Sequence, residues 1–175
     1  MEMLKDFNTS SFKKQKPPSD NSITTKNEIK ELKKIPIKKK FVKEMDDGGA
    51  NFKKIVGNDP LIDKLISSSL PVIMKLKKHF NRKRPAVLAK EQGIEFNDIK
   101  LKSMDTPAYP SGHATTATLL SLVLSDKYPE KENKLKKLAR DIIHSRSVAH
   151  THYKSDNIAG EKLGKLMYNH IKNKV

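Results

Sequence analysis

The sequence predicts an all-α protein, a helical bundle preceded by a disordered basic N-terminal tail. From about residue 60 onward, apolar residues recur at spacings of three and four, the period of an amphipathic helix. No stretch alternates apolar and polar residues as a half-buried strand would. The first 48 residues are rich in Ser, Thr, Asn, Pro and Lys, a composition typical of flexible segments. The residues of that segment that can dock on the domain are Ile35, Ile37, Phe41 and Val42. We therefore expect a flexible Lys-rich tail over residues 1–48 and a helical domain over residues 49–175.

The first helices of the domain are placed by their start and stop signals. Asp59 is expected to cap a helix whose first residue is Pro60. Pro71 then divides this helix from a second one over residues 72–81. The second helix cannot continue to Pro85, because a residue before proline avoids the helical region.

Residues 86–109 are expected to be mostly loop, since Gly93 and Pro107 interrupt them. Three further helices are predicted over residues 113–127, 131–147 and 155–173. Tyr128-Pro129 ends the first of these. Its core face is expected to consist of Leu119, Leu120, Val123 and Leu124.

The composition allows a modest core and gives the chain a strong positive charge. Hydrophobic residues make up 35% and charged residues 32% of the 175 residues, and the formal net charge is +16. Such a charge attracts phosphorylated metabolites, nucleic acid or anionic lipid surfaces. The absence of cysteine excludes disulfides and thiolate metal sites.

The chain shows neither of the usual membrane or export signals. Its N-terminus lacks the apolar run of a secretory signal. The longest apolar stretch, Ala117–Leu124, is far shorter than the roughly 20 residues of a membrane-spanning helix. These features favour a soluble protein that is cytoplasmic or otherwise intracellular.

Three short motifs in the second half of the chain contain residues suited to binding phosphate. The first is K-x6-R-P, in which Lys77 and Arg84 lie about two helical turns apart and can face one side. Lysine supplies a point charge, whereas arginine presents a planar fork to two phosphate oxygens. Several other basic residues lie in the same stretch, so a solvated basic face also explains this segment taken alone.

The second motif is the run Pro110-Ser111-Gly112-His113. Ser111 and Gly112 lie at a helix start, where unpaired backbone N–H groups and the helix dipole attract anions. Gly112 allows close approach of the backbone to a ligand, and Ser111 adds a hydroxyl donor. His113 adds a titratable group. The same residues also fit an ordinary N-cap or a Ser-His hydrolase pair.

The third motif is S-R-x5-H-x3-D, which contains Arg146, His152 and Asp156. The last two are four residues apart, so they share a helix face if the helix starts early. A carboxylate bonded to one imidazole nitrogen fixes the tautomer and leaves the other nitrogen free to attack. A helix-surface pair also explains this spacing. His144 and His150 lack the same carboxylate spacing, and His150-x-His152 suggests a metal only if further ligands complete the shell.

Taken together and in this order, the motifs resemble the signature of the type-2 phosphatidic acid phosphatase superfamily. That superfamily includes bacterial class A acid phosphatases, membrane lipid phosphate phosphatases and vanadium haloperoxidases. The resemblance covers about residues 60–172, and the run Tyr109–His113 looks most like the soluble acid phosphatases. It implies a helical bundle and a soluble, metal-independent phosphatase. Such an enzyme would hydrolyse phosphate monoesters, with lipid phosphates or diphosphates among the candidates, through a phosphohistidine intermediate.

The resemblance also implies a role for each motif residue. His152 would attack phosphorus while Asp156 orients it, and His113 would protonate the leaving alcohol and later help to activate water. Neither a metal nor another cofactor is implied, although vanadate could bind as a phosphate mimic. The groups that would hold the phosphate oxygens are Lys77, Arg84, Ser111, the backbone N–H of Gly112, and Arg146.

The expected partner is a phosphorylated small molecule or a lipid head group. The basic tail adds the prospect of weak contact with nucleic acid or an anionic membrane. A homodimer would cover helix faces left exposed by a chain that is short for the family. Two other functions remain open: a basic nucleic-acid- or membrane-surface-binding protein with a vestigial phosphate pocket, and a vanadate-dependent haloperoxidase.

Overall fold

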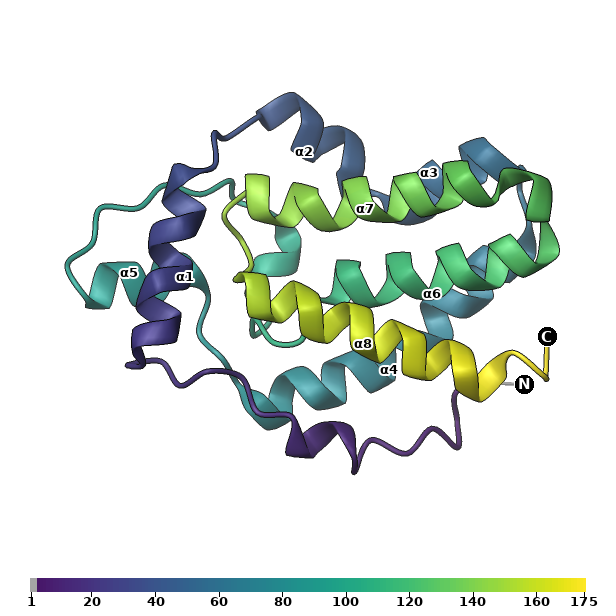
Figure 1. The fold of residues 1–175 in the computed structure, drawn as a ribbon, viewed down its shortest axis with the longest axis horizontal. Helices are drawn as coiled ribbons and strands as arrows, with labels where there is room; N and C mark the ends of the chain where they lie inside the picture. The colour runs from purple at the N-terminus through teal and green to yellow at the C-terminus, as the bar shows by residue number, and fades with distance from the viewer. Residues whose placement is uncertain (1–2) are drawn as a thin grey trace.

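The protein is a bundle of helices, as the sequence predicts. The computed structural model describes residues 3–175, and this range contains helices, turns and loops but no strand (Figure 1). Short 3₁₀ turns lie at Phe12–Lys14, Lys102–Asp105 and Pro129–Lys131. The α-helices of the described range are α1 (Ile23–Lys34), α2 (Lys39–Asp46), α3 (Gly48–Val56), α4 (Pro60–Phe80), α5 (Pro85–Glu91), α6 (Gly112–Lys127), α7 (Glu132–Val148) and α8 (Lys154–Ile171). None of them has the combination of length and apolarity that a membrane crossing requires.

Helix α6 lies at the centre of the bundle, between α7 and α8 (Figure 1). It buries small polar residues such as Thr115 as well as Leu119, Leu120 and Leu124, because neighbouring helices enclose it on several sides. Gly160 and Gly164 of α8 allow close contact with α6. A Cβ added at Gly160 would lie 2.6 Å from the carbonyl oxygen of Ser111. The two helices therefore start side by side, which places the second and third motifs next to each other.

Helix α4 is one continuous helix, and the prediction that Pro71 divides it is wrong. A proline inside a helix frees the carbonyl group one turn earlier, here that of Ser67. Both residues are exposed, so water can bond to the freed carbonyl. Lys77 lies in the last turn of α4, but Arg84 lies beyond the left-handed C-cap at Asn81. The two cations therefore do not share one helix face.

The remaining helix predictions differ from the structure mainly at their ends. Helices α6, α7 and α8 match the predicted segments to within about two residues at each end, which is the usual uncertainty of a helix boundary. The expected loop over residues 86–109 contains most of α5 and a 3₁₀ turn.

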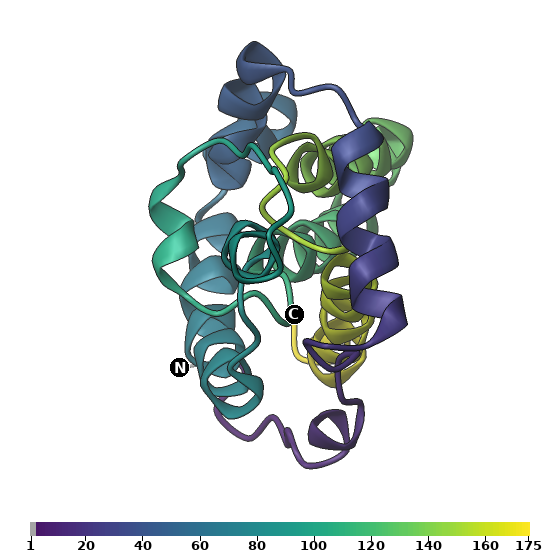
Figure 2. The same cartoon turned by 90° about the vertical axis from the view of Figure 1, so that its left-hand side faces the viewer.

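Residues 3–48 are part of the bundle, so the prediction of a disordered tail over this range is wrong. Phe12 lies fully buried in the main core with Phe52 of α3, and Ile29 of α1 is also fully buried. Val42 of α2 packs against Val148 of α7. Figure 2 shows α1 lying along one side of the bundle. The boundary expected at residue 48 therefore does not divide a tail from a domain, since a few apolar residues anchor a largely basic segment.

The close approach of α6 and α8 leads to a stability prediction. Gly160→Ala places a methyl group against the Ser111 carbonyl, and overpacking of this kind lowers stability by about 1–3 kcal/mol. Urea unfolding measures the change. Gly48→Ala is the matched control, because its Cβ would meet the nearest atom of Ile142 at an ordinary 3.5 Å. Equal stability of the two variants would contradict the close packing.

Candidate functional site

The three motifs meet at one end of the bundle, where α7 ends and α6 and α8 begin (Figure 1). His152 lies in the short connection between α7 and α8, and is only 3% exposed. Arg84 at the start of α5 donates through Nη1 to the carbonyl oxygen of Thr151 at 2.9 Å. The same Nη1 lies 3.0 Å from Nε2 of His152. The first and third motifs are thus in direct contact.

The surroundings of His152 determine which of its nitrogens carries the proton. A guanidinium group can only donate, so Nε2 must accept from Arg84. The proton then lies on Nδ1, which donates to Oδ2 of Asp156 at 3.1 Å. Burial and the nearby Arg84 and Lys77 hold the pKa of His152 well below its usual range. The imidazole is therefore neutral at neutral pH, with a lone pair on Nε2.

Asp156 is fully buried, and its contacts differ from the expected helix-face pairing. Helix α8 starts after His152, so Asp156 reaches back from the first turn of the helix rather than stacking beside the histidine. Its Oδ2 also accepts from the backbone N–H of Tyr153 at 3.0 Å. Its backbone carbonyl accepts from the N–H of Ser111 at 3.0 Å. Asp156 therefore joins the third motif to the second.

Arg82 is the partner of Asp156 that sequence reasoning missed. Its Nη1 donates to Oδ1 of Asp156 at 2.7 Å, and both side chains are almost completely buried. Burial raises the pKa of Asp156, and Arg82 is the main group opposing that rise. Glu28 of α1 accepts from Nη2 of Arg82 at 3.2 Å and from the backbone N–H of Ser155 at 2.6 Å. In the sequence, Arg82 differs in no visible way from the other basic residues near it.

Three cations of the predicted set lie close to His152. Lys77 is 4% exposed, and its Nζ donates to the carbonyl oxygen of Pro107 at 2.6 Å. Burial lowers the pKa of Lys77 to about 7, with a smaller contribution from Arg84. Arg146 is fully buried, and burial lowers its pKa. Its Nη2 has no hydrogen-bond partner in residues 3–175. A bound anion would relieve the repulsion among these groups.

The Pro110–His113 run lies beside these cations at the start of α6. The hydroxyl of Ser111 accepts from the backbone N–H of Ala114 at 3.3 Å, so Ser111 acts as an N-cap. Gly112 faces Lys77, because a Cβ added to the glycine would lie 3.7 Å from the lysine Cε. His113 is half-buried, with Nε2 2.9 Å from the carbonyl oxygen of Asp46. The N-cap interpretation and the anion-site interpretation are therefore compatible.

The other two histidines of this region are engaged elsewhere. The ring nitrogens of His150 each lie 2.8 Å from a backbone carbonyl oxygen, one of Asn97 and one of Ile35. The exposed ring of His144 lies beside Phe41. In the described part of the chain, no three His, Cys, Asp or Glu side chains converge as they would around a metal ion.

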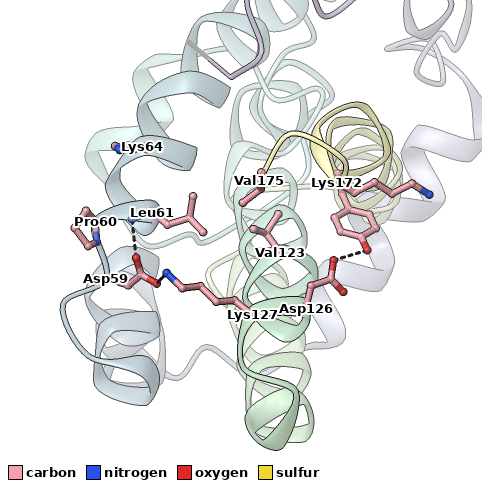
Figure 3. A pocket seen from close by; sticks show the side chains of 10 residues that line it. Asp59, Pro60, Leu61, Lys64, Val123, Asp126, Lys127, Lys172 and Val175 are labelled. Atoms are coloured by element: carbon pink, nitrogen blue, oxygen red, sulfur yellow. Dashed lines mark hydrogen bonds and ion pairs between the residues drawn. The ribbon is translucent and has the colours of Figure 1, made fainter. Parts of the chain in front are cut away.

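A cavity of about 480 Å³ adjoins the site and is lined by Lys77, Gly112 and His113. A larger hollow of about 610 Å³ lies between the start of α4 and the ends of α6 and α8 (Figure 3). Its acids already have partners, since Asp59 accepts from Lys127 at 2.7 Å and Asp126 accepts from Tyr168 at 2.7 Å. Of these two cavities, the smaller one is associated with the motifs, because motif residues line it and none lines the larger hollow.

Comparison with known proteins gives consistent similarities. The family model of the PAP2 superfamily matches residues 63–173, which contain all three motifs. The chain is 36% identical over 88 residues to a non-specific acid phosphatase of Salmonella typhi. It is 35% identical over 88 residues to a non-specific acid phosphatase of Salmonella typhimurium (strain LT2). Each alignment covers 50% of this chain and 35% of the relative, so the chain matches about a third of the length of these curated relatives.

A solved structure extends the likeness in fold to nearly the whole chain. It is described as the first transmembrane PAP2 type phosphatidylglycerolphosphate phosphatase from Bacillus subtilis. The TM-score is 0.50 at 16% identity, over 98% of this chain and 90% of that one. At this identity the comparison concerns the arrangement of helices alone.

The buried pair of Arg82 and Asp156 leads to a second stability prediction. Arg82→Gln leaves a buried carboxylate without its cation, which destabilises a protein by roughly 3–5 kcal/mol. Urea unfolding at neutral pH measures the loss. Lys83→Gln is the control, because its ion pair with Glu91 is about half exposed and its removal should leave the unfolding midpoint unchanged. If both variants were as stable as the parent chain, the pair would not hold Asp156.

Proposed function

Because the chain belongs to the PAP2 superfamily, we propose that it is a phosphatase that hydrolyses phosphate monoesters through a phosphohistidine at His152. The main support is the geometry of that histidine. Its Nδ1 is held by the Asp156 carboxylate, and its Nε2 lone pair is directed at the Arg84 guanidinium. A nucleophile fixed in this way, beside cations that can neutralise phosphate oxygens, has the composition of a phosphoryl-transfer site.

In the first proposed step, Nε2 of His152 attacks phosphorus and the bond between phosphorus and the ester oxygen breaks. The leaving oxygen takes a proton from His113 and departs as an alcohol. In the second step, a water molecule gives a proton to His113 as its oxygen attacks phosphorus. The bond between nitrogen and phosphorus then breaks, which releases inorganic phosphate and restores both histidines.

The phosphate oxygens would be held by Lys77, Arg84 and Arg146, with the backbone N–H of Gly112 and the hydroxyl of Ser111. The unpartnered Nη2 of the buried Arg146 supports this assignment, because a buried guanidinium N–H without a partner is unfavourable unless a ligand binds it. These fixed cations motivate our expectation that hydrolysis proceeds without a metal ion.

The adjoining cavity suggests what the alcohol half of the ester is. It lies against His113, the proposed donor to the leaving oxygen, and its walls are largely apolar. An apolar wall favours an alcohol that buries hydrocarbon there. We therefore propose substrates in which the phosphate carries an alkyl or other apolar group. The apolar lining residues are Phe52, Ile66, Leu70, Ile73, Met74, Ala117, Leu120 and Ile142.

Replacing the proposed nucleophile tests the mechanism. His152→Ala should lower the rate of p-nitrophenyl phosphate hydrolysis in the presence of EDTA by roughly 10³-fold or more. It should also abolish a phosphoenzyme trapped by alkaline quenching of the wild-type reaction, since a phosphohistidine is stable in base and hydrolyses in acid. His144→Ala is the control, because that histidine is exposed, and it should keep full activity. Undiminished activity of the His152 variant would exclude the phosphohistidine.

The apolar cavity predicts a preference for longer alkyl chains. From ethyl to octyl phosphate, kcat/KM should rise by up to about fourfold per methylene group, as expected for buried hydrocarbon. Leu70→Ser should flatten this series without harming the fold, since Leu70 is 55% exposed at the edge of the cavity. Leu166→Ser, on the outer face of α8, should leave the series unchanged. A series that is flat in the wild-type protein would exclude an apolar alcohol site.

A further inference from the structure

Asp46 is an acidic residue at the site that belongs to none of the three motifs. It ends α2, in the segment whose composition predicts a tail. Its carboxylate Oδ1 accepts from Nη1 of Arg146 at 3.0 Å and lies 3.6 Å from Nε2 of His113. Its backbone carbonyl oxygen is 2.9 Å from the same Nε2. Asp46 therefore contacts both Arg146, a residue proposed to bind phosphate, and His113, the proposed proton donor.

The contact with the carbonyl determines how His113 can donate a proton. A carbonyl oxygen only accepts, so Nε2 of His113 carries a hydrogen and directs it at Asp46. A proton destined for the leaving oxygen must then lie on the other ring nitrogen, Nδ1. His113 can act as an acid only in its doubly protonated, positively charged form.

Most of the surroundings disfavour that charged form. Burial and the nearby Arg146 lower the pKa of His113 to about 4, and Lys77 of α4 acts in the same direction. His152, in the connection between α7 and α8, also faces this group. In residues 3–175, Asp46 is the one carboxylate within ion-pair distance of His113. Its charge and its carbonyl both oppose the lowering.

The contact with Arg146 uses one side of the guanidinium. Asp46 accepts from Nη1, and Nε donates to the hydroxyl of Ser145 at 3.0 Å. Nη2 is left without a partner in the described chain. The carboxylate thus fixes the orientation of Arg146 and leaves one nitrogen for an anion.

We propose that Asp46 is a positioning residue for the leaving-group step, one that favours the protonated form of His113 and holds Arg146 with a nitrogen free for phosphate. This inference rests on the proposed function, since it needs a leaving oxygen that requires a proton. It assigns the N-terminal segment a part in the chemistry, outside the stretch that the family model matches.

The test compares Asp46→Asn with the parent chain on two substrates. Asparagine keeps the backbone carbonyl and can still accept from Arg146, but it removes the charge beside His113. The fall of kcat/KM on the high-pH side should therefore move to lower pH. At pH 7 the loss should be about tenfold for octyl phosphate, as for a shift of one pKa unit, and less than about twofold for p-nitrophenyl phosphate. The reason is that nitrophenolate leaves without a proton, whereas an alkoxide does not.

Glu44→Gln is the matched control, because Glu44 is an exposed acid on the same helix that does not contact His113. It should leave both substrates and the pH profile unchanged. Equal losses on both substrates with an unshifted profile, or the same shift in the control, would overturn the role of Asp46 while leaving the phosphatase intact. Full activity of His152→Ala would instead remove the proposed function itself, so the two failures are distinguishable.

Discussion

The buried carboxylate of Asp156 is the constraint on which the rest of the site depends. Its two oxygens accept from His152, the Tyr153 backbone and Arg82, and its backbone carbonyl accepts from Ser111. One residue thereby connects all three segments that carry the motifs. A fully buried carboxylate is tolerated because it accepts several strong hydrogen bonds and pairs with a guanidinium. The close contact of α6 and α8 fixes the backbone around it.

The motifs predicted most of the residues that meet at the candidate site, but not the residues that hold them in place. The structure brings Lys77, Arg84, Arg146, His113 and His152 to one end of the bundle, as the resemblance to the superfamily implies. Their chemical roles remain predictions. Arg82, Glu28 and Asp46 were missed because their importance comes from contacts distant in sequence, which composition and spacing do not encode. Neither of the two suggested helix-face pairs forms: His152 precedes α8, so it does not share a helix face with Asp156, and Arg84 follows the end of α4, so it does not share one with Lys77.

The N-terminal segment shows why its composition led to the prediction of a wrong domain boundary. A segment rich in Lys, Ser and Pro is typical of disorder when it cannot bury enough apolar surface. Here a few apolar residues suffice, among them Phe12, Ile29 and Val42, because the rest of the bundle already supplies the surface that they cover. The expected docking is found for Ile35, Phe41 and Val42, whereas Ile37 does not join their cluster. Docking also extends to earlier residues of the described segment, such as Phe12 and Ile29. The positive charge of this segment is therefore carried by a folded surface rather than by a free arm.

The distances in sequence between contacting residues at the site have a consequence for folding. Asp46 meets Arg146 across 100 residues, and Glu28 meets Ser155 across 127. Closing loops of this size is slow relative to forming the helices themselves, since chain entropy opposes contacts between distant residues. The helices of the bundle can form while the chain is still being synthesised, but the first contact cannot exist until the end of α7 has emerged from the ribosome, and the second until the start of α8 has emerged. The site is therefore expected to be among the last parts of the molecule to assemble, and a partly folded chain would carry the motifs without the geometry that joins them.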